Sequence, residues 1–278
     1  MATLANLKLY LDGLVDRFEK PEFIHNDPIV IPHSFEDPLD QEIIGLYAAL
    51  LAWGQRKTLL KKLEDLCEIM SYKPRKFVYD FDPEKDAHLF ANFIYRTFQP
   101  VDAVSLTTNI SLVIKQFGSL EIAFSSFVKH DDKHIGNGLQ KFSDLLFAIN
   151  PATPTRVRKH LARPLSGSAC KRFCMYLRWV SRPGPVDLGI WNSLSPEKLV
   201  LPLDVHSGRQ ARALGMLNRK NDDWRAVLEL TDNCRYLCPE DPCKYDFAFF
   251  GLGVNKIPID PDHTGTNKID VTSISSDY

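Results

Sequence analysis

The sequence predicts an all-α protein, and the distribution of its apolar residues is the main reason. Apolar residues recur at helical spacing in long runs, most clearly over 40–52, where they are nearly continuous, and over 56–70. Residues three or four positions apart share one face of a helix, so this period is typical of helices packed on a core. Few stretches alternate between apolar and polar residues as a half-buried strand does.

The expected helices follow one another along the chain, separated by glycine and proline residues that break the period. An irregular connector is expected over 21–38. We expect helices over residues 2–19, 40–52, 56–70, a short stretch from Pro74, 83–98, 102–117, 120–128, 135–149, 154–161, 170–181, 204–214, 223–236 and 239–250. These group into a helical bundle over 36–182, a second helical lobe formed by 1–35 with 186–256, and a polar tail over 257–278.

Length and composition are those of an ordinary globular protein. The chain has 278 residues, of which 44% are hydrophobic and 25% charged, and its net charge is -1. No apolar run approaches the roughly 20 residues needed to cross a membrane. Residues 1–20 lack the apolar segment of a signal peptide. We therefore expect a cytoplasmic protein, associated with the nucleoid if it binds DNA; the sequence is silent on its oligomeric state.

Positive charge is concentrated in one segment, although the net charge excludes a strongly basic nucleic-acid binder. No Asp or Glu lies between Leu145 and Val186. The basic residues of this segment are Arg156, Arg158, Lys159, Arg163, Lys171, Arg172, Arg178 and Arg182. Such a patch suits a polyanion. The alternative is a solvated basic face.

Within this segment, Lys171 begins a predicted helix directly after a turn of small residues, 165–169. Asp204 opens a second predicted helix 33 residues later, behind Pro202. A lysine amine with a nearby carboxylate is the minimum set for Schiff-base chemistry on a sugar carbon. The other interpretation is a structural lysine and an Asp that caps its own helix.

The two segments together resemble the helix-hairpin-helix and Gly/Pro-Asp (HhH-GPD) superfamily of DNA glycosylases. The matching residues are Leu165, Gly167 and Lys171 in the turn, then Leu203, Asp204, His206, Arg209, Leu214 and Gly215. Within the superfamily, the chain is similar to a bacterial branch without an assigned function. Its long Lys-to-Asp separation is similar to that of archaeal 8-oxoguanine glycosylases. The resemblance implies a two-lobed helical glycosylase fold with an active-site cleft between the lobes.

The resemblance also assigns roles. Lys171 would attack C1′ of an extruded nucleotide, and Asp204 would stabilise the positive charge that develops there. The implied DNA-binding residues are Gly167, Ser168, Ala169, Arg172, Gln55, Arg56, His206 and Arg209. For His206 and Arg209 an exposed surface pair is an equal alternative. Trp53 would stack on a flipped base or belong to the core.

Two departures from the superfamily pattern affect the expected site. Ser166 and Ala169 replace the usual proline and second glycine of the hairpin, which alters the grip on phosphate. The four-cysteine iron–sulfur pattern is absent, so no cluster and no other cofactor is expected. A metal site is suggested by the close spacing of Cys234, Cys238 and Cys243. These cysteines lack the paired spacing of a zinc knuckle, however, and we predict no metal there.

The predicted activity is removal of a damaged base, an oxidised purine being the expected class, with strand nicking by Lys171. The partner would be duplex DNA carrying a damaged or abasic nucleotide. Two alternatives remain open. One is a catalytically inactive protein that binds nucleic acid on the same scaffold; the other is a helical interaction protein that binds no nucleic acid.

Overall fold

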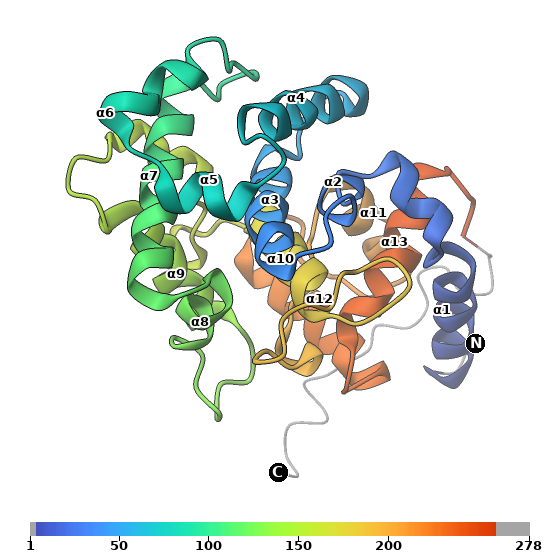
Figure 1. Cartoon of the computed structure of the whole chain (residues 1–278). Helices are drawn as coiled ribbons and strands as arrows, with labels where there is room; N and C mark the ends of the chain where they lie inside the picture. Colours follow the sequence, from blue (N-terminus) through green and yellow to red (C-terminus); the bar gives the residue numbers. More distant parts are fainter. Residues whose placement is uncertain (1–3, 260–278) are drawn as a thin grey trace.

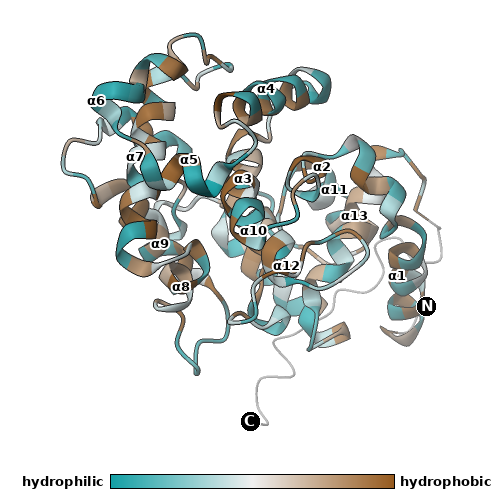
Figure 2. Cartoon of the chain, viewed as in Figure 1, coloured by the Kyte–Doolittle hydropathy of each residue, from teal (hydrophilic) through white to brown (hydrophobic). Residues whose placement is uncertain are grey.

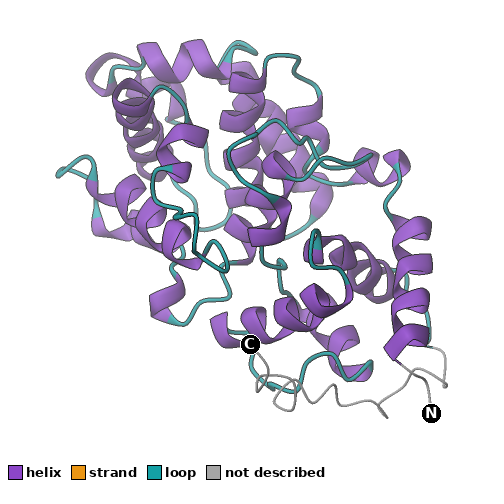
Figure 3. Cartoon of the chain, turned by 90° about the horizontal axis from the view of Figure 1, so that it is seen from below, coloured by secondary structure: helices purple, strands orange, loops and turns teal. Residues whose placement is uncertain are grey.

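The all-α prediction is confirmed. The structure, a computed structural model, describes residues 4–259, so the predicted tail lies outside the described residues from position 260 onward. Helices, turns and loops make up this part of the chain, which contains no strand (Figure 3). No helix within 4–259 is both long and apolar enough to cross a membrane.

The first part of the chain is built from short and medium helices. These are α1 (Leu4–Phe18), the 3₁₀ helix η1 (Pro21–Asn26), α2 (Val30–His33), α3 (Pro38–Leu51), α4 (Arg56–Ile69), α5 (Pro74–Asp80), α6 (Pro83–Asp86), η2 (Ala87–Phe90), α7 (Pro100–Phe117), α8 (Leu120–Ser125) and α9 (Gly136–Ala148). The second part contains η3 (Thr155–His160), η4 (Pro164–Ser166), α10 (Lys171–Ser181), η5 (Pro196–Lys198), α11 (Val205–Ala213), α12 (Trp224–Leu237), η6 (Pro242–Lys244) and α13 (Tyr245–Val254).

Helices α3 and α10 pack against each other at the centre of the molecule. Asp37 caps α3 by accepting a hydrogen bond from Leu39 N–H at 2.9 Å, and Pro38 fits the first helical position. The following run from Ile43 to Leu51 is fully buried, which accounts for its nearly continuous apolar sequence. Helices α5 to α9 gather on one side of this pair, and α1, α11 and α13 on the other (Figure 1).

The core forms one continuous cluster that includes residues from α1 to α13. Figure 2 shows hydrophobic stretches in α7 and α9, whereas α6 is largely hydrophilic. Helix α13 packs between α1 and α11. This contact is close, because a Cβ on Gly251 would lie 2.3 Å from the Phe18 ring.

Three predicted boundaries are wrong. Residues 83–98 do not form one helix: α6 and η2 end at Phe90, and a tight turn joins Tyr95 to Phe98. The aromatic rings of this segment pack edge to face instead of forming a helical stripe. The connector 21–38 contains η1 and α2, and α13 starts at Tyr245 because Pro242 sits in a preceding 3₁₀ turn.

Glu42 of α3 carries a buried carboxyl that joins three elements. Its oxygens accept hydrogen bonds from Leu120 N–H and Glu121 N–H at the start of α8, at 3.0 and 3.2 Å. They also accept one from Trp191 Nε1–H at 3.0 Å. Burial raises the pKa of Glu42 to about 7, although these donors act in the opposite direction.

Glu42 should therefore make stability depend on pH. Between its ordinary pKa and about 7 the unfolded chain has lost this proton while the folded chain still holds it, so stability falls as pH rises through this window. A shift of this size corresponds to about 3 kcal/mol. Urea unfolding at pH 5 and pH 8 should show that Glu42→Gln lacks this component, and that Glu121→Gln, a control at a half-buried neighbour, retains it. An equal pH dependence in all three proteins would contradict the assignment.

Candidate functional site

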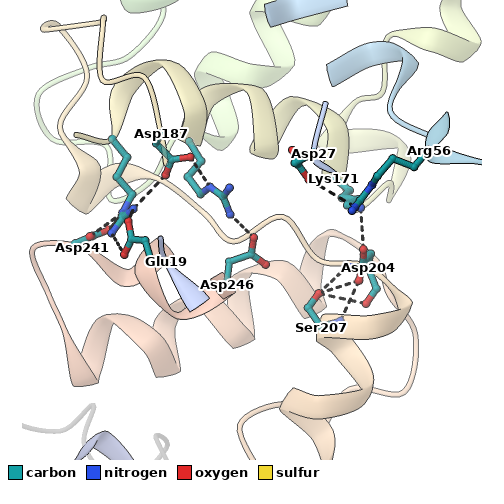
Figure 4. Close-up of polar contacts among 11 residues, drawn as sticks. Glu19, Asp27, Arg56, Lys171, Asp187, Asp204, Ser207, Asp241 and Asp246 are labelled. Atoms are coloured by element: carbon teal, nitrogen blue, oxygen red, sulfur yellow. Dashed lines mark hydrogen bonds and ion pairs between the residues drawn. The ribbon is translucent and has the colours of Figure 1, made fainter. Parts of the chain in front are cut away.

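The structure brings Lys171 and Asp204 together. Lys171 is the first residue of α10, Asp204 caps α11, and Lys171 Nζ lies 2.7 Å from Asp204 Oδ2 (Figure 4). The two side chains retain 33% and 17% of their exposure, so the pair is sheltered and still reachable from solvent. Two residues far apart in sequence thus form one ion pair at the ends of two helices.

The turn before α10 sets the position of Lys171. Gly167 adopts a φ of 79°, which residues other than glycine rarely adopt, and Cys170 adopts a φ of 50°. A non-glycine residue in the left-handed region carries backbone strain, which is common next to functional residues. Trp224 N–H donates to the Gly167 carbonyl at 3.2 Å and ties the turn to α12. These constraints fix where α10 begins.

Asp204 is held by the helix that it caps. Its Oδ1 accepts hydrogen bonds from His206 N–H and Ser207 N–H at 2.8 and 2.9 Å, and Ser207 Oγ accepts one from Asp204 N–H at 2.9 Å. Burial alone would raise the pKa of the Asp204 carboxyl, but Lys171 and these backbone donors outweigh it and lower the pKa. Asp204 is therefore a carboxylate whose second oxygen is turned to the lysine.

The Lys171–Asp204 pair lines a cavity with a volume of about 700 Å³. Aromatic side chains form part of the wall, and Phe23 of η1 packs edge to face against Phe247 and Phe250 of α13. Pockets for small organic ligands range over roughly 300–1,000 Å³ and are mostly apolar with a few convergent polar groups. This cavity has the size and lining of such a site.

Part of a set of ion-paired residues lines the cavity, whereas Glu19, Arg182, Asp187 and Asp241 of this set lie outside the lining. Six carboxyl groups contact four cationic side chains in ion pairs (Figure 4). The carboxyl groups are those of Glu19, Asp27, Asp187, Asp204, Asp241 and Asp246, and the cations are Arg56, Lys171, Arg178 and Arg182. Because carboxyl groups outnumber cations, burial favours a proton on at least one of them.

Asp27, Arg178 and Asp246 line the cavity and were missed as site residues from the sequence. Arg178 Nε donates to Asp187 Oδ1 at 3.2 Å, and its Nη1 donates to Asp246 Oδ2. Burial raises the pKa of Asp246 to about 7 and also raises the pKa of Asp27. The sequence does contain a signal for Arg178 and Asp246. Each is a charged residue in an otherwise apolar helical run, and a charged residue buried in such a helix needs a partner.

A comparison with family models finds one match, the family described as "Protein of unknown function (DUF2400)", over residues 27–255. The chain belongs to this family. The matched region includes the Lys171 turn, Asp204 and most of the cavity wall; Phe23 lies before it. No curated protein and no solved structure matches the chain.

The resemblance to the HhH-GPD superfamily is thereby corrected. The DUF2400 model covers both segments on which that resemblance rested, and no HhH-GPD model matches the chain. A turn glycine before a helix and a capping Asp behind a proline occur in many α-helical proteins, because local backbone geometry requires them. These short patterns identified the residues that meet in the structure, but not the family.

The prediction of an α-helix over 154–161, as the first helix of the hairpin, is also wrong for this DUF2400 chain. The segment is the 3₁₀ helix η3, in which side chains three residues apart lie on the same side. Val157 and His160 have this spacing and are both buried, with His160 Nε2 3.3 Å from Asp102 Oδ2.

Only some of the DNA-binding residues predicted from the sequence line the cavity. Ser168, Ala169, Arg172, Arg56 and His206 line the cavity. Arg172 Nη1 donates to the Leu50 carbonyl at 2.6 Å, so its guanidinium caps α3. Gly167, Gln55 and Arg209 are exposed and lie outside the cavity wall. Trp53 lines the cavity, and the Arg96 guanidinium lies 4.9 Å from its ring centre.

The basic segment does not form a free cationic patch. Arg156 contacts Asp102 at 3.0 Å, Arg158 contacts Asp144 at 2.7 Å, and Arg163 lies 3.8 Å from Asp144. Arg178 and Arg182 belong to the buried network. The acidic partners come from before and after the segment, so segregation of charge along the sequence is lost on folding.

The six cysteines are free and buried in residues 4–259. Burial raises the pKa of the Cys170 thiol, next to Lys171, to about 12, so this thiol stays protonated at neutral pH. Cys234 and Cys243 are also buried, and burial raises their thiol pKa values well above the usual range. Lys171 is therefore the candidate nucleophile of the turn.

Proposed function

We propose that this chain acts on damaged duplex DNA, using Lys171 as an amine nucleophile at C1′ of an extruded nucleotide. The observation that carries this proposal is the 2.7 Å contact of Lys171 Nζ with Asp204 at the cavity. A carboxylate in this position accepts the proton that the ammonium must lose before the amine can attack.

The chemistry balances with these two residues and the nucleotide. The Lys171 nitrogen forms a bond to C1′ while the C1′–base bond breaks, and the base leaves with the electron pair. The base takes up the proton that Asp204 accepted from the lysine, so Asp204 is again a carboxylate. As the sugar ring opens, the C1′–O4′ bond breaks and Asp204 passes a proton from the bonded nitrogen to O4′, which gives a Schiff base. Asp204 then takes a proton from C2′, and the 3′ phosphate leaves with the electron pair of the C3′–O bond. Asp204, held as a carboxylate by two backbone N–H groups, stabilises the positive charge at C1′.

The cavity supports a nucleotide as the substrate. Its volume of about 700 Å³ accommodates a base with its sugar, and the aromatic wall of Phe23, Phe247 and Phe250 suits the stacking of a flipped base. Because most arginines of the basic segment are paired internally, phosphate contacts would come from Arg209 and from Arg56, which stays exposed although it pairs with Asp27 at 3.7 Å. An oxidised purine is the proposed class of base.

Borohydride trapping on a duplex that carries an abasic site tests this proposal. Wild type should give a covalent adduct, and Lys171→Gln should give less than about 1% of it, because no other amine replaces the nucleophile. Lys159→Gln is a matched control on the same basic segment and should retain the adduct. Absence of an adduct with wild type would overturn the proposal.

Salt-dependent binding of the duplex without an adduct would instead favour the second candidate function, nucleic-acid binding without catalysis. The observation in its favour is that Lys171 forms a direct ion pair with Asp204, which keeps the amine occupied in the free protein.

A further inference from the structure

Asp246 and Asp27 are two buried carboxyl groups of the cavity that have no part in the proposed chemistry so far. Asp246 belongs to the first turn of α13, is 7% exposed and lines the same cavity as Lys171 and Asp204. One of its oxygens, Oδ2, accepts a hydrogen bond from Arg178. Figure 4 shows Asp246 on the side of Asp204 that faces Asp187 and Glu19.

The cations near Asp246 are also engaged by other carboxylates, so they neutralise its charge only in part. Arg178 is shared with Asp187, whose Oδ1 it contacts at 3.2 Å, and Lys171 is engaged by Asp204. The charged groups that act on Asp246 are Arg178 and Lys171, which favour its ionised form, and Asp187 and Asp204, which oppose it. The thiols near it are Cys174 of α10, Cys234 of α12 and Cys243 of η6.

These thiols do not change the balance, because burial raises their pKa values well above the usual range and keeps them neutral. Burial of Asp246 is the largest influence and outweighs Arg178, which raises its pKa to about 7. A carboxyl group that still holds a proton near neutral pH and faces a reaction cavity is suited to act as a general acid.

We propose that Asp246 is the general acid that completes imine formation at Lys171. This inference rests on the proposed function and deepens it. After Asp204 accepts a proton from Lys171, the amine forms a bond to C1′ of the abasic aldehyde while the C1′=O π bond opens. The oxygen takes the proton from Asp204, and Asp204 then accepts one from the nitrogen, which gives a neutral carbinolamine. Asp246 then donates its proton to the carbinolamine hydroxyl, the C1′–O bond breaks, water leaves, and the nitrogen lone pair forms the C=N bond.

The test is the rate of adduct formation on an abasic duplex with cyanoborohydride, measured from pH 5.5 to 8.5. With wild type, the rate should fall on the alkaline side as Asp246 loses its proton, with a midpoint near 7. Asp246→Asn should be slower by at least about tenfold at pH 6 and should lack this alkaline limb. Near-UV circular dichroism of the variant shows whether it is folded.

Asp27→Asn is the matched control, because Asp27 is a second buried carboxyl of the same cavity whose pKa burial also raises. This variant should keep the alkaline limb. If Asp246→Asn kept the wild-type profile, or if Asp27→Asn alone removed the limb, the role of Asp246 would be overturned while the Lys171 adduct stood. Absence of any wild-type adduct would overturn both the proposed function and this inference.

Discussion

Replacing Asp204 by Asn is expected to slow adduct formation on an abasic duplex by about 10²-fold or more while changing stability little. The reason is that Asp204 has two separable roles. Its Oδ1 caps α11, a role that Asn fills as well as Asp. Its Oδ2 lies 2.7 Å from Lys171 Nζ, where an amide can neither take the proton of the lysine nor stabilise positive charge at C1′.

Single-turnover trapping and urea unfolding of the same preparations measure the two roles. Asp223→Asn is the control, because Asp223 also caps a helix and pairs with a cation, in its case Arg219, but lies outside the cavity wall. The control should trap as fast as wild type. An Asp204→Asn variant that is folded and as fast as wild type would show that Asp204 only caps its helix.

Replacing Arg182 by Met is expected to destabilise the fold by about 3–5 kcal/mol. Arg182 is 5% exposed and contacts Glu19, Asp187 at 3.1 Å and Asp241 at 2.8 Å. It thereby ties the segment after α1 and the segment before η6 to the end of α10. Its removal leaves Glu19 and Asp241 without this cation and Asp187 with Arg178 alone, so the desolvation cost of these carboxylates is no longer offset.

The corresponding control for stability is Arg219→Met. Arg219 pairs with Asp223 near the surface, where solvent screens an ion pair and its contribution to stability is small. Urea denaturation of both variants and wild type measures the difference. Equal losses for Arg182→Met and Arg219→Met would mean that the buried network does not hold these elements together.

The sequence predicted the parts of the fold that local rules determine. The apolar periods over 40–52, 56–70 and 135–149 correspond to α3, α4 and α9 within a few residues at each end. Segment 83–98 was mispredicted because its apolar rings pack on one another across a turn, and a period count does not distinguish such packing from a helical face. Residues 154–161 failed because the 3₁₀ and α periods are nearly alike over six residues.

The site could be predicted only where its residues carry a local signature. Lys171 follows a small-residue turn and Asp204 caps a helix, so each was recognisable, and the structure places them in contact. Arg178 and Asp246 carry no such signature, since their pairing depends on how α10 meets α13. The prediction of a free basic patch failed for the same reason. Two of the carboxylates that pair with its arginines, Asp102 and Asp144, come from α7 and α9.

The most direct measurement of the central claim is peptide mapping, by mass spectrometry, of wild type reduced with borohydride on a duplex that carries an abasic site. Lys171 as the amine nucleophile predicts one sugar-modified peptide, the one that contains Lys171. Modification of any other lysine, or none at all with the duplex present in excess, would contradict it.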